Sequence, residues 1–301
     1  MIVPNQRNIK VHFAGMEQVN FARCAMLGGA RYGLYTAYSF LAKKFGIKEG
    51  YPCKLKPGMD LATEINRLDL RHCIQDSGLF TLMFGSGKGG KYDRKFLERW
   101  LHALCDFVLE KDIRATCVEV DCQKVLGVND AWDFRQTMRE RLPGHRIINV
   151  FHMEDGRKGL DRLVEFSDYM AISVPELRIY FGHSKMRTHV VSLARYIKQR
   201  KPSIDIHLLG CTDIQLLKEC SFCSSSDSTT WLTINRFGNT RGRMRRDIKD
   251  DARKPYEASV REIAAYYGNK QTDSFIKYLS NYAMIARYFW NHYQKAAGDQ
   301  S

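Results

Sequence analysis

Two aspartates, Asp76 and Asp227, have surroundings that suit catalytic carboxylates. Each follows a short β-like run, and small residues flank it: Ser77 and Gly78 come after Asp76, and Asp227 lies between two serines. Gly78 allows the backbone to turn sharply beside the carboxylate. Paired carboxylates with different pKa values can break a glycosidic bond through a covalent intermediate. We therefore expect Asp76 and Asp227 to face each other across a pocket.

An aspartate at a strand end is usually a helix N-cap, and this simpler role fits Asp213, which precedes a helical stretch at residues 214–219. Asp76 and Asp227 differ because the sequence predicts no apolar helix directly after either of them. Capping therefore does not account for these two carboxylates.

A glycine-rich stretch from Gly85 to Lys91 approaches the pattern of a phosphate-binding loop. Tyr92, however, stands where Ser or Thr must bind magnesium. We interpret the stretch as a basic loop that contacts phosphate backbone through Lys88 and Lys91, in preference to an NTPase loop.

The chain also has one C-x-x-C pair, Cys220 and Cys223. A structural zinc site needs four ligands, and His207 and Cys211 could complete a set only from a predicted strand and a helix entry. Small thiols in a core are the favoured interpretation, and no metal site is expected.

The chain carries a large excess of positive charge. Its 301 residues include 47 Lys and Arg against 33 Asp and Glu, a net charge of +14. Eight basic residues and three aspartates lie between residues 236 and 254. Such clustering favours a polyanionic partner over a merely solvated basic surface. The residues expected to contact nucleic acid are Lys88, Lys91, Arg236, Arg241, Arg243, Arg245 and Arg246.

Several features indicate a cytoplasmic protein without a membrane partner. No stretch approaches the ~20 apolar residues of a membrane span. The first seven residues lack the apolar core of a signal peptide. The nine cysteines, an odd number, are scattered in a manner typical of reduced intracellular thiols. The oligomeric state is left open.

Strand-like and helix-like segments alternate along most of the chain, which predicts a parallel sheet. Helices are expected at residues 35–45, 93–110, 132–141, 159–166, 188–199 and 214–219. Seven strands are expected at residues 10–15, 71–76, 115–121, 145–152, 169–173, 205–209 and 222–226, and an eighth at 231–235.

The placement of polar residues favours a TIM-like (β/α)8 barrel over an open doubly wound sheet. An open sheet concentrates its site at one switch point, whereas a barrel assembles its site from many strand ends around one rim. The residues at predicted strand ends are Asp76, Asp121, His152, Ser173, Gly210 and Asp227.

After the expected barrel (residues 1–240), residues 241–301 are expected to form a basic segment and a helical extension. Two helices are expected there, at 256–267 and 272–297, the second capped by Thr272 or Asp273 and closed by Gly298. Its aromatic residues are expected to pack against the barrel.

Two motifs resemble those of the tRNA-guanine transglycosylases. Residues 76–80, Asp-Ser-Gly-Leu-Phe, resemble the family's D-S-G-G-F/Y-Q motif. Residues 208–210 and 226–231, followed by Arg236, resemble the late segment that carries its nucleophile. The D-S-T-x-W form, the short chain and the lack of an extra RNA-binding domain are closer to the DNA 7-deazaguanine transglycosylases (DpdA) of phages and bacteria. The resemblance spans residues 10 to 246.

The resemblance implies a role for each matching residue. Asp227 would attack C1′ of a deoxyguanosine and hold the sugar covalently. Asp76 would protonate the departing guanine and then deprotonate an incoming 7-deazaguanine base. Phe80 would stack on the base, and Asp121 would bind its amine and ring N–H edge. Ser77, Gly78, His152, Ser173 and Gly210 would line the base pocket.

The resemblance also implies DNA and a free 7-deazaguanine base as partners, and no cofactor. His152 stands where the family has Gln, Ser173 where it has Gly, and Leu79 and Thr81 replace residues of the first motif. The zinc signature is absent, since no cysteine follows Cys223. A tRNA enzyme, a DNA glycosylase that only releases the base, and a non-catalytic nucleic-acid-binding barrel are the alternatives.

Overall fold

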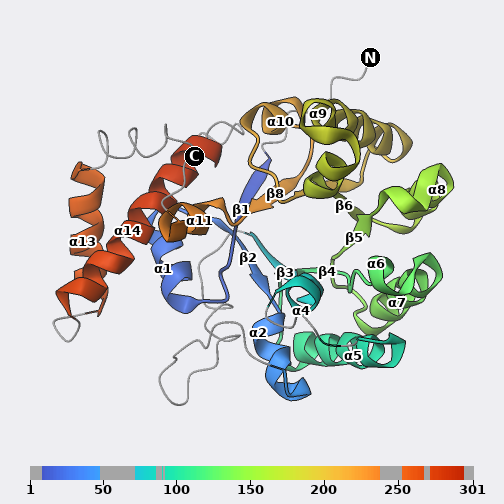
Figure 1. Cartoon of the computed structure of the whole chain (residues 1–301), viewed down its shortest axis with the longest axis horizontal. Helices are drawn as coiled ribbons and strands as arrows, with labels where there is room; N and C mark the ends of the chain where they lie inside the picture. Colours follow the sequence, from blue (N-terminus) through green and yellow to red (C-terminus); the bar gives the residue numbers. More distant parts are fainter. Residues whose placement is uncertain are drawn as a thin grey trace.

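Eight parallel strands form a closed barrel in sequence order (Figure 1). The computed structural model describes residues 9–47, 72–85, 90, 92–237, 253–267 and 272–294. The barrel confirms the (β/α)8 fold expected from the sequence. Its strands are β1 Lys10–Ala14, β2 Tyr32–Thr36, β3 His72–Asp76, β4 Thr116–Val118, β5 Ile147–Phe151, β6 Tyr169–Ser173, β7 Asp205–Leu209 and β8 Ser225–Ser228.

Helices connect the strands and surround the barrel. Asp93 caps α5 by accepting a hydrogen bond from the Phe96 N–H at 2.8 Å, and Asp213 caps α10, as expected. No helix among the described residues is long and apolar enough to span a bilayer. The described helices that follow the strands are α1 Val19–Leu27, α2 Tyr38–Leu41, η1 Ala42–Phe45, α4 Leu79–Phe84, α5 Arg94–Glu110, α6 Gln123–Leu126, α7 Val128–Arg141, η2 Met153–Asp155, α8 Gly156–Phe166, α9 Val174–Arg200, α10 Ile214–Glu219 and α11 Thr230–Phe237.

Two predictions about the strands were wrong. The segment 231–235 belongs to helix α11, because Trp231 and Leu232 pack inward from a helix and the Trp231 indole N–H donates to the Ala14 carbonyl at 2.9 Å. The missing strand is β2, whose last two residues, Tyr35 and Thr36, fall within the helix predicted at 35–45. Four of the five residues of β2 are buried, so the strand lacks the alternation that marks a half-exposed one.

Two other strands have ends that differ from the predicted ones. β4 ends at Val118, three residues before Asp121, and β8 begins at Ser225, so that Asp227 lies inside the strand and pairs with His12 of β1. Helices α4 and α11 begin within three residues of Asp76 and Asp227, which corrects the expectation that no helix follows them.

The barrel interior explains why the candidate residues meet. Alternate residues of a strand point to the same side, and the interior is filled by Ala14, Leu34, Ile74, Val118, Ile148, Val150, Tyr169 and Ala171. Asp76, His152 and Ser173 each follow one of these residues by two positions. Their side chains therefore continue the inward-facing rows to the carboxyl-terminal rim, where barrel enzymes carry their sites.

The C-terminal helices α13 (Arg253–Tyr267) and α14 (Asp273–Phe289), with the π-helix η3 (Trp290–Gln294), lie beside α1 and α11 on one side of the barrel (Figure 1). Thr272 caps α14, as expected. Tyr282, Phe289 and Trp290 are buried, whereas Tyr278 is about half exposed.

Gln294 attaches this extension to the first strand. Its side-chain oxygen accepts a hydrogen bond from the Val11 N–H at 2.7 Å, and its nitrogen donates to the Ile9 carbonyl at 3.0 Å. The pairing of β1 with β2 begins only at Phe13. The Gln294 amide thus takes the place of a neighbouring strand. The predicted Gly298 closure lies outside the described residues.

Candidate active site

Asp76, Asp121 and Asp227 come within electrostatic range of one another at the rim. Burial is the main cause that raises the pKa of Asp76 to about 6, and the charges of Asp227 and Asp121 raise it further. Hydrogen bonds from the Gly78 N–H and the Thr36 hydroxyl favour the ionised form of Asp76 and partly offset this rise in its pKa. The rim thus holds one carboxyl group that can gain and lose a proton near neutral pH, beside two other carboxyl groups.

The two hydrogen bonds to Asp76 use the same oxygen. Its Oδ2 accepts from the Gly78 N–H at 2.9 Å and from the Thr36 hydroxyl at 3.2 Å. Gly78 has φ +82°, and a Cβ there would lie 2.6 Å from the Tyr38 nitrogen, so that only glycine fits. Among the described residues no hydrogen bond uses Oδ1 of Asp76, which leaves this oxygen free to carry a transferable proton.

Asp227 is held by strand β7. Its Oδ1 accepts from the Gly210 N–H at 2.9 Å and from His207 Nε2 at 3.1 Å. In the described part of the chain, Oδ2 has no hydrogen-bond partner. A carboxylate that is held by one oxygen and has the other oxygen free can act as a nucleophile.

A chain of hydrogen bonds continues from Asp227 into the barrel interior. A carboxylate oxygen accepts, so His207 donates from Nε2. Nδ1 of His207 lies 2.5 Å from the Ser225 hydroxyl. Ser225 in turn contacts the Tyr169 hydroxyl at 2.5 Å. Both His207 and Ser225 are fully buried. These partners fix the His207 tautomer that points its N–H at Asp227.

Two more histidines lie in the interior beneath the rim, and both are neutral at pH 7. Burial is the main cause that lowers the pKa of His72 to about 4 and that of His12 well below its usual range. Nε2 of His12 lies 2.7 Å from Nδ1 of His72, and Nδ1 of His12 donates to the Ser226 carbonyl. This layer adds no charge beneath the three aspartates.

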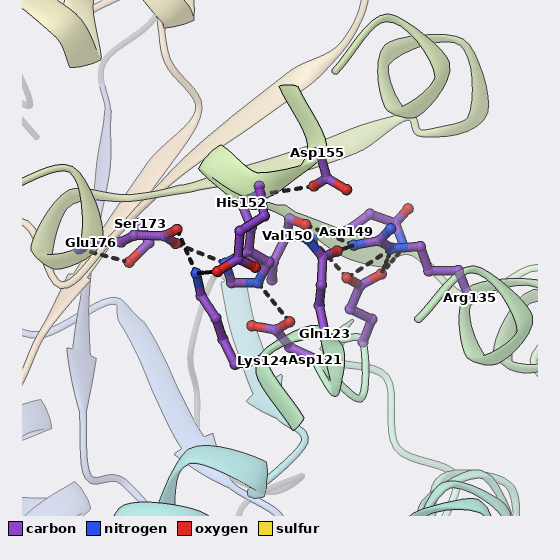
Figure 2. Close-up of polar contacts among 12 residues, drawn as sticks. Asp121, Gln123, Lys124, Arg135, Asn149, Val150, His152, Asp155, Ser173 and Glu176 are labelled. Atoms are coloured by element: carbon purple, nitrogen blue, oxygen red, sulfur yellow. Dashed lines mark hydrogen bonds and ion pairs between the residues drawn. The ribbon is translucent and has the colours of Figure 1, made fainter. Parts of the chain in front are cut away.

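On the other side of the rim, His152 joins two carboxylates (Figure 2). Its Nε2 lies 2.7 Å from Asp121 Oδ1, and its Nδ1 lies 2.7 Å from Glu176 Oε2. Burial disfavours the charged ring, but the hydrogen bonds to Asp121 and Glu176 prevail and raise the pKa of His152 to about 10. Burial alone would raise the pKa of Glu176, but the hydrogen bonds from His152 and Lys124 favour its charged form and lower the pKa to about 2. His152 is therefore an imidazolium that uses both N–H groups to hold carboxylates.

A buried ion pair supports Asp121 from behind. Arg135 Nε donates to both oxygens of Glu119 at 3.0 Å, and Arg135 Nη2 donates to the Val150 carbonyl at 2.9 Å. Glu119 also accepts from the Asn149 side chain at 2.6 Å and from the Val150 N–H at 3.0 Å. Since β4 ends at Val118, the Glu119 side chain replaces the next backbone hydrogen bond between β4 and β5. This contact fixes the backbone two residues before Asp121.

The other predicted pocket residues have structural contacts. The Ser77 carbonyl accepts from the Trp100 indole N–H at 3.0 Å. The Ser173 hydroxyl caps α9 by accepting from the Glu176 N–H at 3.3 Å. The ring of Phe80 is 73% exposed and lies 5.3 Å from the Phe84 ring, so that it is available for stacking.

The predicted nucleic-acid contacts fall almost wholly outside the described residues. Arg236 belongs to α11. Lys88, Lys91, Arg241, Arg243, Arg245 and Arg246 lie outside the described part of the chain.

The chain matches no protein-family model and no curated protein. Its function is therefore inferred from the geometry of the rim.

The eight described cysteines are free, and Cys220 and Cys223 are fully buried, as expected of core thiols. Within the described ranges, no three His, Cys, Asp or Glu side chains are arranged to hold a metal ion.

The sequence reasoning missed several residues that complete the site, namely Thr36, Glu119, Lys124, Arg135, Glu176 and His207. Two of them carried a signal. His207 is flanked by Ile206 and Leu208, and Glu119 lies between two valines. A polar residue flanked by apolar ones in a buried strand must find a partner inside the protein.

Proposed function

We propose that this protein is a base transglycosylase that replaces guanine in DNA with a free 7-deazaguanine base. The observation that carries the proposal is the unlike pair of carboxylates at one rim. Asp227 is oriented with Oδ2 free, and the pKa of Asp76 is raised to about 6. Environments that separate the roles of two carboxyl groups in this way are typical of glycosidic chemistry.

The proposed reaction has two displacements at one carbon. Oδ2 of Asp227 attacks C1′ of the target nucleoside, the bond from C1′ to the base nitrogen breaks, and the base leaves with the proton of Asp76. The sugar is then held as an ester of Asp227. Asp76, now ionised, takes the ring N–H proton of the incoming base, whose nitrogen attacks C1′ and releases Asp227 as a carboxylate. The ester retains the energy of the broken glycosidic bond, so that the exchange needs no nucleotide energy source.

Asp121 is the residue proposed to recognise the base. Its Oδ1 is engaged by His152, and among the described residues no hydrogen bond uses Oδ2. This free oxygen suits the adjacent N–H donors that guanine and 7-deazaguanines share. Since both ring nitrogens of His152 are already engaged, we assign it to holding Asp121 and not to direct contact with the base.

The target nucleotide has to leave the base stack to reach a pocket at the barrel rim. The excess of positive charge, +14 over the chain, favours the DNA backbone as a partner.

The test is exchange of radiolabelled guanine out of DNA and, in parallel, out of tRNA, with a 7-deazaguanine supplied and no ATP. Release from DNA that depends on the added base supports the proposal. Release from tRNA alone would keep the mechanism and change the substrate. Release without incorporation would identify a glycosylase, and release from neither would favour a binding protein.

The Asp227→Asn variant tests the nucleophile. It should form no denaturation-resistant adduct with DNA and no exchanged product, while it still binds DNA. Asp213→Asn is the matched control, because this aspartate lies at the same rim but caps α10, and Asn caps helices as well as Asp does. An adduct formed by Asp227→Asn would show that the nucleophile is another group.

A further inference from the structure

A part of α9 at the rim, residues 178–185 (the rim segment), exposes apolar and basic side chains together. Ile179 is 83% exposed and Tyr180 is 52% exposed, and Arg178 and Lys185 are exposed as well. Large apolar side chains at such exposure are worth explaining when they lie together beside a site.

The rim segment contains a kink that only glycine permits without strain. Gly182 has φ +73° and ψ +166°, which interrupts the helix. The Phe181 ring stacks on His189, with centroids 3.7 Å apart, and fixes the two parts of α9 to each other. The kink thus holds Ile179 and Tyr180 in a defined position at the rim.

The rim segment borders the proposed active site. Tyr180 follows Glu176 by one helical turn, and Lys124 connects the two: its Nζ lies 3.0 Å from Glu176 Oε1 and 5.8 Å from the Tyr180 ring centroid. Figure 2 shows Lys124 reaching Glu176 beside His152. Through this chain of contacts, Tyr180 lies next to the residues that hold Asp121.

The charge of this region is one-sided. Residues 177–204 include seven Lys or Arg and no Asp or Glu. Farther from the rim, Arg200 and Lys201 pair with acidic residues of or next to α8. Arg187, closer to the rim, pairs with Asp213. Within the described part of the chain, neither Arg178 nor Lys185 has an acidic partner. These two cations are left for an anionic ligand.

Exposed aromatic rings also lie on the other side of the site. Phe80, which is 73% exposed, and Phe84, which is 62% exposed, belong to α4, directly after β3. Strands β4 and β5, which precede Asp121 and His152, separate β3 from β6 and α9 in the barrel. Stacking surfaces therefore flank the site on two sides.

We propose that the rim segment binds unpaired DNA beside the target nucleotide, with Tyr180 stacked on a neighbouring base and Arg178 and Lys185 on phosphates. The proposal rests on the proposed function and adds that the substrate is single-stranded or locally opened. Basic groups interleaved with exposed aromatic rings are the usual platform for single strands. A closed duplex hides its base faces, so it could use the two cations but not the ring.

Binding measured by fluorescence anisotropy tests the proposal, with one labelled oligonucleotide used both single-stranded and as a duplex, and with no free base added. Tyr180→Ala should weaken single-strand binding by about tenfold and leave duplex binding unchanged. Tyr180→Phe, which keeps the ring, should bind as the wild type does. The double variant Arg178→Ala/Lys185→Ala should reduce the slope of log affinity against log salt by about 1.4 for the single strand.

The matched control is Arg195→Ala. Arg195 is exposed on the same helix, about 15 Å from Lys185 along its axis, and its loss should change neither affinity nor slope. The proposal is overturned if Tyr180→Phe binds as weakly as Tyr180→Ala, if Tyr180→Ala weakens the duplex equally, or if the double variant behaves as Arg195→Ala.

These outcomes are separate from the proposed chemistry. If the wild type binds single strands through Tyr180 but exchanges no base, the proposed function fails and the binding surface stands. If the wild type exchanges bases and the rim variants bind single strands normally, the binding surface is refuted and the proposed function stands.

Discussion

Each of the three rim aspartates has one oxygen engaged by the protein and one oxygen without a partner among the described residues. The engaged oxygens are Oδ2 of Asp76, Oδ1 of Asp121 and Oδ1 of Asp227. Their hydrogen bonds come from backbone N–H groups, a hydroxyl and two histidines, which fix the orientation of each carboxyl group. The remaining oxygens are available for a proton, for a base edge and for C1′, respectively, in the proposed reaction.

His207 is a positioning residue in this scheme, because it acts on the substrate only through Asp227. His207→Leu removes one of the two hydrogen bonds to the nucleophile. A hydrogen bond to a charged group contributes about 1.5–3 kcal/mol, so kcat for exchange should fall roughly 10- to 100-fold with KM little changed. Single-turnover measurement of adduct formation would locate the loss in the first displacement.

Two further variants separate orientation from general disturbance of the barrel interior. His207→Gln keeps an N–H near the position of Nε2 and should recover most of the rate. His72→Gln changes another interior histidine that makes no contact with Asp227 and should leave kcat near the wild-type value. Equal losses in all three variants would contradict the assigned role.

Asp76→Asn should abolish exchange and also stabilise the protein at alkaline pH. The pKa of Asp76 is about 6 in the folded state, above its ordinary value of 3.8. The folded state therefore favours the protonated form, and this contribution is present below about pH 4 and lost as the pH rises through 6. At pH 8 the neutral variant should have a free energy of unfolding about 1–3 kcal/mol higher than that of the wild type.

Denaturant unfolding at pH 4 and pH 8 measures this difference, which should nearly vanish at pH 4. If the wild type is as stable as Asp76→Asn at pH 8, or more stable, then the folded state does not disfavour the charged form of Asp76. Asp213→Asn should not gain stability between pH 4 and pH 8 in this way, because the pKa of Asp213 is lowered in the folded state. Burial would raise this pKa, but the hydrogen bonds from the Leu216 N–H and Arg187 favour the charged form and outweigh burial.

At the scale of elements, Gln294 ties the C-terminal extension to the barrel. Gln294→Leu would leave the Val11 N–H and the Ile9 carbonyl buried without partners, and each such group costs about 1–3 kcal/mol. We expect the free energy of unfolding to fall by about 2–4 kcal/mol in denaturant titrations. The control is Asn291→Ala, which changes an exposed neighbour and should lower the free energy of unfolding far less. An equal fall in the two variants would contradict a stabilising role for the hydrogen bonds between Gln294 and β1.

The start of α9 links the support of the site to its rim. Ser173 caps the helix, Glu176 in the first turn holds His152, and Tyr180 lies one turn later. The same helical turn thus connects the residues that orient Asp121 to the surface proposed to bind DNA. Since the kink at Gly182 follows directly, this short first part of α9 is set off from the longer part that covers the barrel.

For the whole molecule, the excess of positive charge predicts a steep dependence of DNA affinity on salt. The site itself is lined by carboxylates, so the binding energy must come from basic residues around it. If six or more phosphates are contacted, affinity should fall by about a thousandfold between 50 and 200 mM salt. Anisotropy titrations at several salt concentrations measure the slope, and a slope near zero would mean that the charge is a solvated surface without a polyanionic partner.

The local signals in the sequence determined much of the fold and the approximate place of the site. Alternating strand and helix patterns, the caps Asp213 and Thr272, and polar residues at strand ends depend on near neighbours in the chain. They were enough to predict a closed barrel and to place Asp76 and Asp227 at its rim. The same signals failed for β2, whose burial on both faces removed the alternating pattern, and for α11, whose short apolar run fits a strand or a helix equally well.

The tertiary structure decided what the local pattern could not contain. His207 reaches Asp227 from a neighbouring strand, His152 after β5 reaches Glu176 in α9, and Gln294 bonds to Val11, 283 positions away. The pKa of Asp76 depends on its burial and on two other carboxylates. Hydrogen-bond partners and desolvation are properties of atoms that meet only when the barrel closes. Residue types and spacing therefore named the candidate groups, while the closed barrel set their orientation and the raised pKa of Asp76.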